Sequence, residues 1–344
     1  MKPLRPPLRY LHDQPENGVP VEVAPGLLWV RLPLPFALDH VNVWLVDEGD
    51  GWTVIDAGYA DGESRAIWET LLGGILSGRP VTRVVATHYH PDHIGLAGWL
   101  CTRTGAALWT SRTEWLTARM LTLDTTASFA EIGAAHDRSA GMSEEWVLQR
   151  ETRGNLYRRG VTLASPSYTR VAADDVLTLA GGDWRVIVGE GHAPEMLTLH
   201  CPERNLLIAA DQILPRISPI IGVWPMNPDA DPLADYLTSL ERYRYIDDGC
   251  CVLPSHDGPF VGLQPRIDQL IAHHRQRLDM CRELCRRPRT VAEVMQHLFR
   301  RDVDLHQVGF AQGETLSHLN HLICRGELER TVGPDGVWHF VRID

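Results

Sequence analysis

Short apolar runs separated by turn-forming residues dominate the first part of the chain. Three such runs cover Leu27–Leu32, Val41–Val46 and Trp52–Asp56. This spacing is typical of a strand meander. A helical pattern follows around Ser64–Leu76, and a further apolar run, Val81–Ala86, leads directly into a histidine-rich segment. The pattern therefore predicts a β layer that carries this segment on a strand-to-helix loop.

Helical spacing replaces the strand pattern between about residues 111 and 168. Large apolar side chains are spread there among charged residues: Trp115, Met120, Phe129, Trp146 and Tyr157. We expect an inserted helical cap near the functional site, because the segment is long for a plain connection, and such loop-borne caps often carry specificity. Two interpretations of these side chains stay open: they pack the insert onto the core, or they line an apolar pocket for an acyl group.

Strand patterns return later in the chain, and each ends shortly before a histidine or an aspartate. The pairs are Trp184–Val188 with His192, Leu206–Ala210 with Asp211, and Cys251–Leu253 with His256. A strand that ends at such a residue delivers its side chain to the edge of the sheet. We therefore expect these three side chains to meet the histidine-rich loop.

The end of the chain has a different pattern. Thr290–Glu293 is a capping box that opens a short helix, and Leu316, Leu319 and Ile323 form one face of a second helix. Two β runs joined by the turn segment Gly333–Gly336 follow. We predict three parts: an extended, proline-rich lead-in at residues 1–25, a catalytic domain at 26–266 and a winged-helix-like domain at 267–344.

Composition narrows the classes of protein and partner. A chain of 344 residues with 44% hydrophobic residues can bury a large core, and no run approaches the roughly 20 apolar residues of a membrane span. Seven cysteines without a CxxC pair favour reduced thiols, and with no secretory-signal pattern we expect a cytoplasmic protein. The formal net charge of −11 opposes long-range attraction to nucleic acid.

The histidine-rich segment has the spacing of a metal-binding loop. His88 and His90 are two residues apart, so both rings can face one side of an extended loop, while Asp92 and His93 face a second position. With the three strand-end residues, the candidate metal ligands are His88, His90, Asp92, His93, His192, Asp211 and His256. Such ligands suit zinc, with iron(II) and manganese as alternatives. We therefore predict two divalent metal ions, with zinc as the first choice.

The ordered set HxHxDH, Gly191-His192, Ala210-Asp211 and Ser255-His256 resembles the metallo-β-lactamase superfamily over roughly residues 25–265. The resemblance implies an α+β fold, an αβ/βα sandwich of two mixed sheets with helices outside. It also implies ligand roles: His88, His90 and His192 for a first metal, Asp92, His93 and His256 for a second, and Asp211 as a bridge. Asp56 matches a family element that supports the metal loop.

The implied metals define the chemistry. Two cations that share a water lower its pKa toward about 7, so a metal-bridging hydroxide can attack at neutral pH. Asp92 and Asp211 are the candidate catalytic residues, because they would position that hydroxide. We predict a hydrolase acting on a carbonyl-centred substrate: a thioester, ester or lactone. One alternative is an endoribonuclease or other phosphodiesterase that uses the C-terminal tail, and another is a non-catalytic metal-binding regulatory protein.

The substrate cannot be taken from the resemblance, because Ala193–Met196 departs from the glyoxalase II-like motif after His192. A C-terminal winged-helix-like tail resembles a β-lactamase-like subgroup that includes a mitochondrial endoribonuclease. Residues 274–344, however, contain 11 arginines against 10 aspartates and glutamates, which is a near-neutral balance. We expect a small-molecule acyl substrate rather than nucleic acid, and a tail that packs on the catalytic domain or on a second subunit of a homo-oligomer.

Overall fold

The structure of this chain, a computed structural model, describes residues 8–299 and 307–343. Residues 1–7 of the expected lead-in and residues 300–306 and 344 of the tail lie outside the described residues. The chain divides into two units. Unit 1 comprises Met1–Leu123, Leu156–Pro219 and Arg242–Arg266, and unit 2 comprises Asp124–Asn155, Ile220–Glu241 and Ile267–Asp344.

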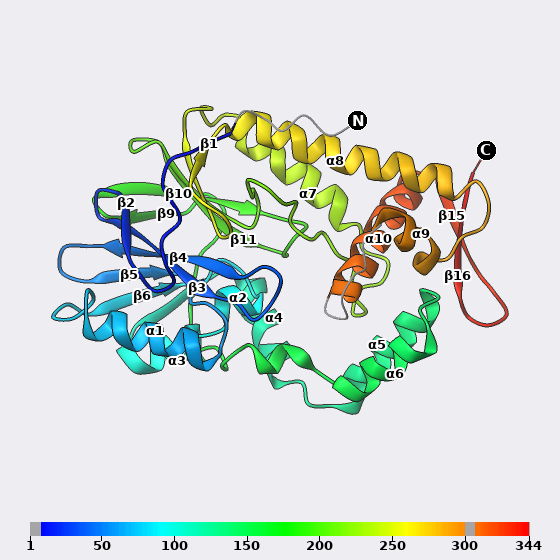
Figure 1. The fold of residues 1–344 in the computed structure, drawn as a ribbon, viewed down its shortest axis with the longest axis horizontal. Helices are drawn as coiled ribbons and strands as arrows, with labels where there is room; N and C mark the ends of the chain where they lie inside the picture. The colour runs from blue at the N-terminus through cyan, green and yellow to red at the C-terminus, as the bar shows by residue number, and fades with distance from the viewer. Residues whose placement is uncertain (1–7, 300–306, 344) are drawn as a thin grey trace. The chain divides into compact units, whose positions relative to one another are not determined.

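Unit 1 contains two mixed β-sheets of seven strands each (Figure 1). The first sheet has the order β2 (Val21–Ala24), β3 (Leu27–Pro33), β4 (His40–Asp47), β5 (Trp52–Ile55), β6 (Val81–Val85), β7 (Ala107–Thr110) and β8 (Thr169–Arg170). The second has the order β1 (Arg9–Tyr10), β14 (Phe260–Val261), β13 (Cys251–Pro254), β12 (Leu206–Ala210), β11 (Met196–Cys201), β10 (Gly182–Gly189) and β9 (Val176–Leu179). In the first sheet the successive pairs from β5 through β6 and β7 to β8 are parallel, and in the second sheet β12 is parallel to β13. Parallel neighbours end at the same sheet edge, so their following loops meet there.

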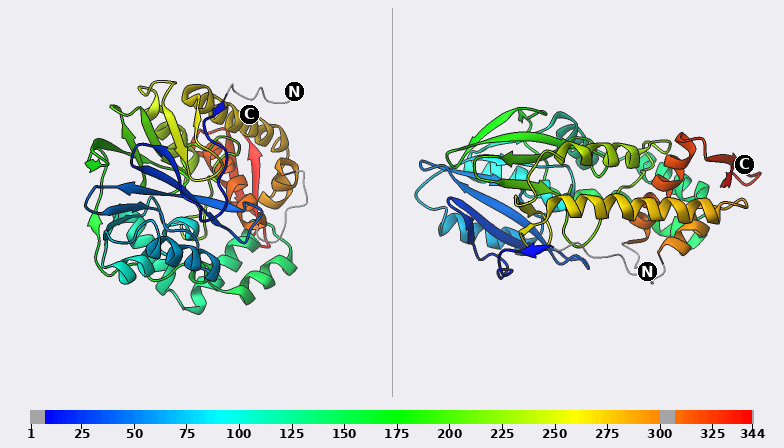
Figure 2. Two further views of the ribbon diagram at one scale, coloured as in Figure 1. Left: turned by 60° about the vertical axis from the view of Figure 1, so that its left-hand side comes forward. Right: turned by 90° about the horizontal axis from the view of Figure 1, so that it is seen from above.

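A shared apolar core lies between these two sheets. Alternating residues of β3 and β4 point into it, and the rings of Trp29 and Trp44 stack with their centroids 6.3 Å apart. Trp184 and Leu197 face them from the second sheet and are fully buried. Figure 2 shows the blue strands of one sheet and the green strands of the other as two layers. Helices α1 (Gly62–Gly73) and α3 (Ala97–Thr104) pack on the first sheet (Figure 1).

Three further helical elements of unit 1 lie between β6 and β8 in the chain. They are α2 (Pro91–Ile94), α4 (Arg112–Leu123) and the 3-10 helix η1 (Leu156–Arg159). The 3-10 helix η2 (Glu241–Tyr243) and α8 (Leu263–Leu284) include residues of both units. The first turn of α4 and the whole of η1 therefore belong to the same unit as the histidine-rich loop.

Unit 2 is mostly helical. It contains α5 (Ala127–Ser139), α6 (Glu144–Arg153), α7 (Pro232–Leu240), most of α8, α9 (Val291–Leu298), α10 (Gln307–Cys324) and the hairpin β15 (Leu328–Val332) with β16 (Trp338–Arg342). The predicted capping box is confirmed at the start of α9, where Thr290 and Glu293 exchange hydrogen bonds. Asp231 caps α7 by accepting a hydrogen bond from the Ala234 amide. A helical C-terminal segment that ends in a hairpin is thus present, and its winged-helix character stays a prediction.

The expected cap divides between the two units. Its helices α5 and α6 belong to unit 2, where buried Asp137 accepts hydrogen bonds from Trp146 Nε1 at 3.0 Å and from Gln312 Nε2 at 2.9 Å. Trp115, in unit 1, stacks on Tyr168 and donates its indole N–H to the Ser165 carbonyl. Both tryptophans therefore have packing roles. This agrees with the interpretation that these side chains pack the insert, and not with a lining of an acyl pocket.

The structure confirms the predicted α+β fold with two mixed sheets flanked by helices. The structure also contains strands that the sequence pattern did not predict, among them β1 and β2 in the lead-in and β11 after the His192 loop. The Val21–Ala24 run is short and flanked by prolines, so its pairing with β3 depends on a partner that a local pattern does not reveal. All seven cysteines are free thiols, and no helix among the described residues is long and apolar enough to cross a membrane.

Candidate metal centre

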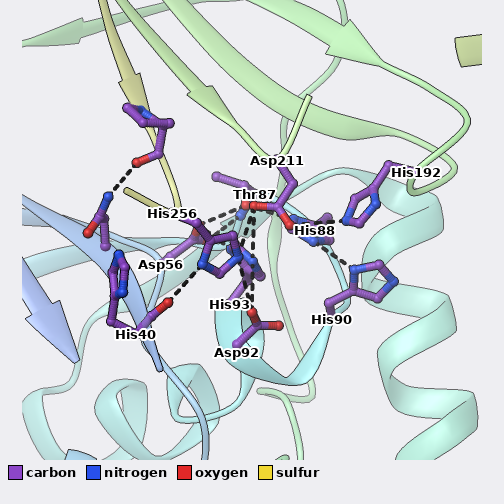
Figure 3. Close-up of polar contacts among 12 residues, drawn as sticks. His40, Asp56, Thr87, His88, His90, Asp92, His93, His192, Asp211 and His256 are labelled. Atoms are coloured by element: carbon purple, nitrogen blue, oxygen red, sulfur yellow. Dashed lines mark hydrogen bonds and ion pairs between the residues drawn. The ribbon is translucent and has the colours of Figure 1, made fainter. Parts of the chain in front are cut away.

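The seven predicted ligands lie together at one edge of the unit 1 sheets (Figure 3). The histidine-rich loop follows β6, and the other three residues follow β10, β12 and β13. Two trios have potential ligand atoms within 4.8 Å of one another: His88, His90 and His192, the first trio, and Asp92, His93 and His256, the second trio. The same limit holds for a set that joins them, His88, His93 and Asp211. The structure therefore brings together residues that are far apart in the sequence, in the grouping that the resemblance implies.

Thr87 determines the orientation of His88. Its hydroxyl donates to Asp56 Oδ2 at 2.8 Å, because a carboxylate can only accept, and it must then accept from His88 Nδ1 at 3.0 Å. This leaves the lone pair of His88 on Nε2, which lies 3.0 Å from His90 Nδ1. Both nitrogens thus face the same point, as two ligands of one cation do.

A carboxylate positions His93 in the same way. Asp56 Oδ2 lies 2.8 Å from His93 Nδ1, and this leaves His93 Nε2 facing Asp92 Oδ2 and Asp211 Oδ1, each at 3.5 Å. His256 is oriented by a backbone group, since its Nδ1 donates to the His40 carbonyl at 2.8 Å. A hydrogen bond to the outer ring nitrogen is the usual way to fix the tautomer of a metal-binding histidine.

Asp211 lies between the trios. Its Oδ2 is 3.3 Å from His192 Nε2, while its Oδ1 is 3.5 Å from His93 Nε2 and 3.4 Å from His256 Nε2 (Figure 3). The two oxygens therefore face different histidines. This is the geometry that a carboxylate needs to bridge two cations.

Burial and charge determine which groups are ionised. Burial lowers the pKa of His90 to about 3 and the pKa of His88 well below its usual range, so both rings are neutral at pH 7. Burial also disfavours the charged form of His93, but the adjacent carboxylates outweigh it and raise the pKa of His93 well above its usual value. For Asp211, burial opposes ionisation, and the nearby His256 and His93 nevertheless hold its pKa well below the usual range. The cluster thus holds carboxylates that are charged at neutral pH.

Backbone strain is concentrated at these strand ends. Asp56, Ala210 and Asp257 have φ angles of 62°, 46° and 69°, in the left-handed region that residues other than glycine rarely adopt. Ala210 immediately precedes Asp211, and Asp257 immediately follows His256. Such angles cost about 1–3 kcal/mol each and persist where the surrounding structure fixes a functional side chain.

The donor set fits a pair of divalent cations. His93 Nε2 and Asp211 Oδ1 are buried, have no hydrogen-bond partner among the described residues and lie 3.5 Å apart. A buried polar atom without a partner costs free energy, and a cation between these two atoms would remove that cost. Histidine nitrogens with carboxylate oxygens are also the ligands that zinc and related borderline ions prefer.

Three supporting residues were not singled out by the sequence: His40, Thr87 and Glu114. A fourth, Tyr157, was singled out only as a side chain that packs the insert or lines an acyl pocket. The carboxylate of Glu114 accepts hydrogen bonds from the Tyr89 and Glu195 amides at 2.8 and 2.6 Å. The Tyr157 hydroxyl donates to the Tyr89 carbonyl at 2.5 Å. Glu114 stands in the first turn of the predicted insert, where an acidic residue is ordinary, so the sequence gives no local signal for its role.

Known proteins match most of this chain. Residues 37–256 match the family model of the metallo-beta-lactamase superfamily, and residues 278–343 match that of the metallo-beta-lactamase-like C-terminal domain. The chain is 29% identical over 308 residues to the probable metallo-hydrolase YqjP of Bacillus subtilis strain 168, covering 85% of this chain and 91% of that protein.

Solved structures extend the match to nearly the full length. A beta-lactamase domain protein from Burkholderia ambifaria is 40% identical, with a TM-score of 0.91 and coverage of 98% of each chain. The metallo-beta-lactamase family protein TTHA1429 from Thermus thermophilus is 28% identical, with a TM-score of 0.78 and coverage of 94% of this chain and 100% of that one. The chain therefore belongs to the metallo-β-lactamase superfamily and is a metallo-hydrolase with a histidine and aspartate cluster suited to metal binding.

Proposed function

We propose that the chain is a dinuclear metal-dependent hydrolase that cleaves a carbonyl-centred bond in a thioester, ester or lactone. The observation that carries the proposal is the position of Asp211, whose two oxygens face the first trio and the second trio separately. His88, His90 and His192 would hold one cation, and Asp92, His93 and His256 the other. A mononuclear site would not require the second set of ligands.

When bound, two such cations supply an acidified water as the nucleophile and a Lewis acid for the carbonyl oxygen. The side chains of the cluster position that water and receive its proton. The Asp92 side chain is 21% exposed against 8% for Asp211, so Asp92 is the carboxylate that solvent and substrate can reach. Asp92 would accept a hydrogen bond from the attacking water, while the more buried Asp211 holds the two trios together.

An aromatic pair in unit 1 favours an uncharged acyl group as substrate. The rings of Phe36 and Tyr59 pack edge to face with centroids 5.4 Å apart. Burial raises the pKa of Tyr59, and the charges of Asp61 and, to a smaller extent, Asp92 raise it further. Aromatic side chains in the unit that holds the candidate site suit an apolar carbonyl compound, and the net charge of −11 disfavours a polyanion.

The test is the metal content of the purified protein, together with hydrolysis of acyl thioesters, aryl esters, lactones and a single-stranded RNA. We expect about two metals per chain and metal-dependent turnover of an acyl compound. Metal-dependent RNA cleavage with inert acyl compounds would contradict the proposed substrate class. Bound metal without any turnover would instead indicate a regulatory protein.

Replacing Asp211 tests the bridge directly. Asp211→Ala should lose turnover and at least one metal, because it removes the only carboxylate among the described ligands that faces both trios. Asp183→Ala, an exposed aspartate on β10, is the matched control and should keep metal and activity. Full activity with two metals in Asp211→Ala would show that the site is wrongly assigned.

A further inference from the structure

Glu114 links the two loops that carry the first trio. One carboxylate oxygen accepts from the Tyr89 amide at 2.8 Å, and Tyr89 lies between His88 and His90. The other accepts from the Glu195 amide at 2.6 Å, three residues after His192. A single side chain thus sets how far the loop after β6 stands from the loop after β10.

The helix that carries Glu114 is held by the same loop in return. The Glu195 carboxylate accepts from the Thr113 amide at 2.8 Å, in the first turn of α4. Glu114 therefore accepts a hydrogen bond from the His192 loop, and Glu195 of that loop accepts one from the helix that carries Glu114. This reciprocal pair of hydrogen bonds leaves little freedom for either element to move alone.

Tyr157 binds the second backbone polar group of Tyr89, its carbonyl. Its hydroxyl donates to the Tyr89 carbonyl at 2.5 Å, so both backbone polar groups of Tyr89 are bound by side chains from α4 and η1. We call Glu114 and Tyr157 together the Tyr89 clamp. It fixes the peptide groups on either side of Tyr89, and these position the rings of His88 and His90.

Glu114 is an unusual residue for a purely structural contact. Its side chain is completely buried, and its hydrogen bonds come from backbone amides rather than from an arginine or lysine. A buried carboxyl of this kind costs free energy, and burial raises the pKa of Glu114 to about 7 despite the opposing backbone hydrogen bonds. A cost of this kind is expected where a group fixes the geometry of a site.

We propose that the Tyr89 clamp is a positioning device that sets the metal affinity of the His88, His90 and His192 trio selectively. The inference rests on the proposed dinuclear site. Selectivity follows because the second trio has other supports, namely Asp56 for His93 and the His40 carbonyl for His256. The three hydrogen bonds of the clamp end at the backbone of Tyr89 and Glu195, beside the ligands of the first trio.

The test measures zinc binding to the metal-stripped full chain by competition with a chromophoric chelator, and Co²⁺ absorption as a second readout. His192→Ala and His256→Ala identify which binding step belongs to which trio. We expect Glu114→Gln to weaken the first trio by about 10- to 100-fold and to leave the second within about 3-fold, because the glutamine side chain can accept only one of the two backbone hydrogen bonds and leaves the other buried amide without a partner. Tyr157→Phe, a nearly isosteric change, should weaken the same trio by a smaller factor.

Glu314→Gln is the matched control, because it alters another buried glutamate but lies in unit 2. It should leave both zinc affinities unchanged. Wild-type affinities in both Glu114→Gln and Tyr157→Phe, or equal losses at both trios, would overturn the clamp while leaving the proposed function intact. A wild-type protein that binds no metal would overturn the proposed function itself, and the clamp with it.

Discussion

Asp56 shows how one side chain can orient ligands of both trios. Its Oδ1 accepts from the Thr87 amide at 2.8 Å, and its Oδ2 accepts from the Thr87 hydroxyl and from His93 Nδ1, each at 2.8 Å. Through Thr87 it determines the tautomer of His88, and directly it determines that of His93. Its φ angle of 62° places the carboxylate at this position at a cost in backbone strain.

Replacing Asp56 should therefore affect both metals. In Asp56→Asn an NH2 group, which only donates, would replace a carboxylate oxygen that accepts hydrogen bonds. We therefore expect zinc affinity to fall by about 10- to 100-fold at both trios. Unfolding of the metal-free variant should cost about 1–3 kcal/mol less than that of the wild type, since hydrogen bonds to a buried charged group are lost. Chelator competition and urea unfolding measure the two effects, and unchanged affinity at either trio would contradict this role.

The candidate ligands and the support Asp56 could be predicted from the sequence, but the supporting roles of Glu114 and Tyr157 could not. His192, Asp211 and His256 each follow a recognisable strand pattern, and their order matches a known set. Glu114 and Tyr157 act on a backbone N–H and a backbone C=O that every residue has, over separations of 25 and 68 positions. Because such contacts depend on where the chain folds back, no local pattern indicates them.

Two facing histidines join helices α8 and α10 in unit 2. His318 Nδ1 lies 2.7 Å from the Glu314 carbonyl, which can only accept, so this nitrogen carries the hydrogen. His318 Nε2 then accepts from His274 Nδ1 at 3.2 Å. Both rings are completely buried in this pair, and burial lowers the pKa of His318 to about 3, an effect to which the nearby Arg277 also contributes.

This helix contact predicts a pH dependence of stability. The unfolded chain binds a proton at His318 below about pH 6.5, whereas the folded chain does not, so stability is complete above that pH and falls as the pH is lowered. At pH 5 the loss from His318 alone should be about 2 kcal/mol. In His318→Gln, the loss of unfolding free energy between pH 7.5 and pH 5 should be smaller than in the wild type by about that amount. Urea unfolding of metal-stripped protein followed by circular dichroism measures it, and equal losses would show that the buried pair does not control the dependence.

Elements with strong local patterns were the predictable part of the fold. Short apolar runs indicated β3 to β6, and the capping box indicated the start of α9. What the patterns did not indicate was association. Helices α5 and α6 join α10 through Asp137 and Gln312, which are 175 positions apart, and the sequence alone placed these helices with the catalytic domain. Tertiary contacts of this kind decide which elements form one unit.

At the scale of the whole molecule, the candidate site is confined to one unit. All seven candidate ligands belong to unit 1, although they come from four separate strand ends. A metal that binds the folded state and not the unfolded chain stabilises the fold by about 4 kcal/mol when its concentration is 1,000 times the dissociation constant. That stabilisation should therefore first be seen in the loops of unit 1, because those loops lose the ligand bonds when the metal is removed.

Hydrogen exchange before and after chelation tests this confinement. Removing the metals should speed amide exchange by about 10-fold or more in residues 87–96, 190–196 and 255–262, because a local opening there no longer breaks metal bonds. Residues 291–298 and 307–324, which form α9 and α10 in unit 2, serve as the internal reference and should keep their protection. An equal increase across both sets would mean that metal binding stabilises the two units as one. No increase in either set would show that these strand ends hold no metal. The adjacent histidines alone would then balance the charge of the buried carboxylates.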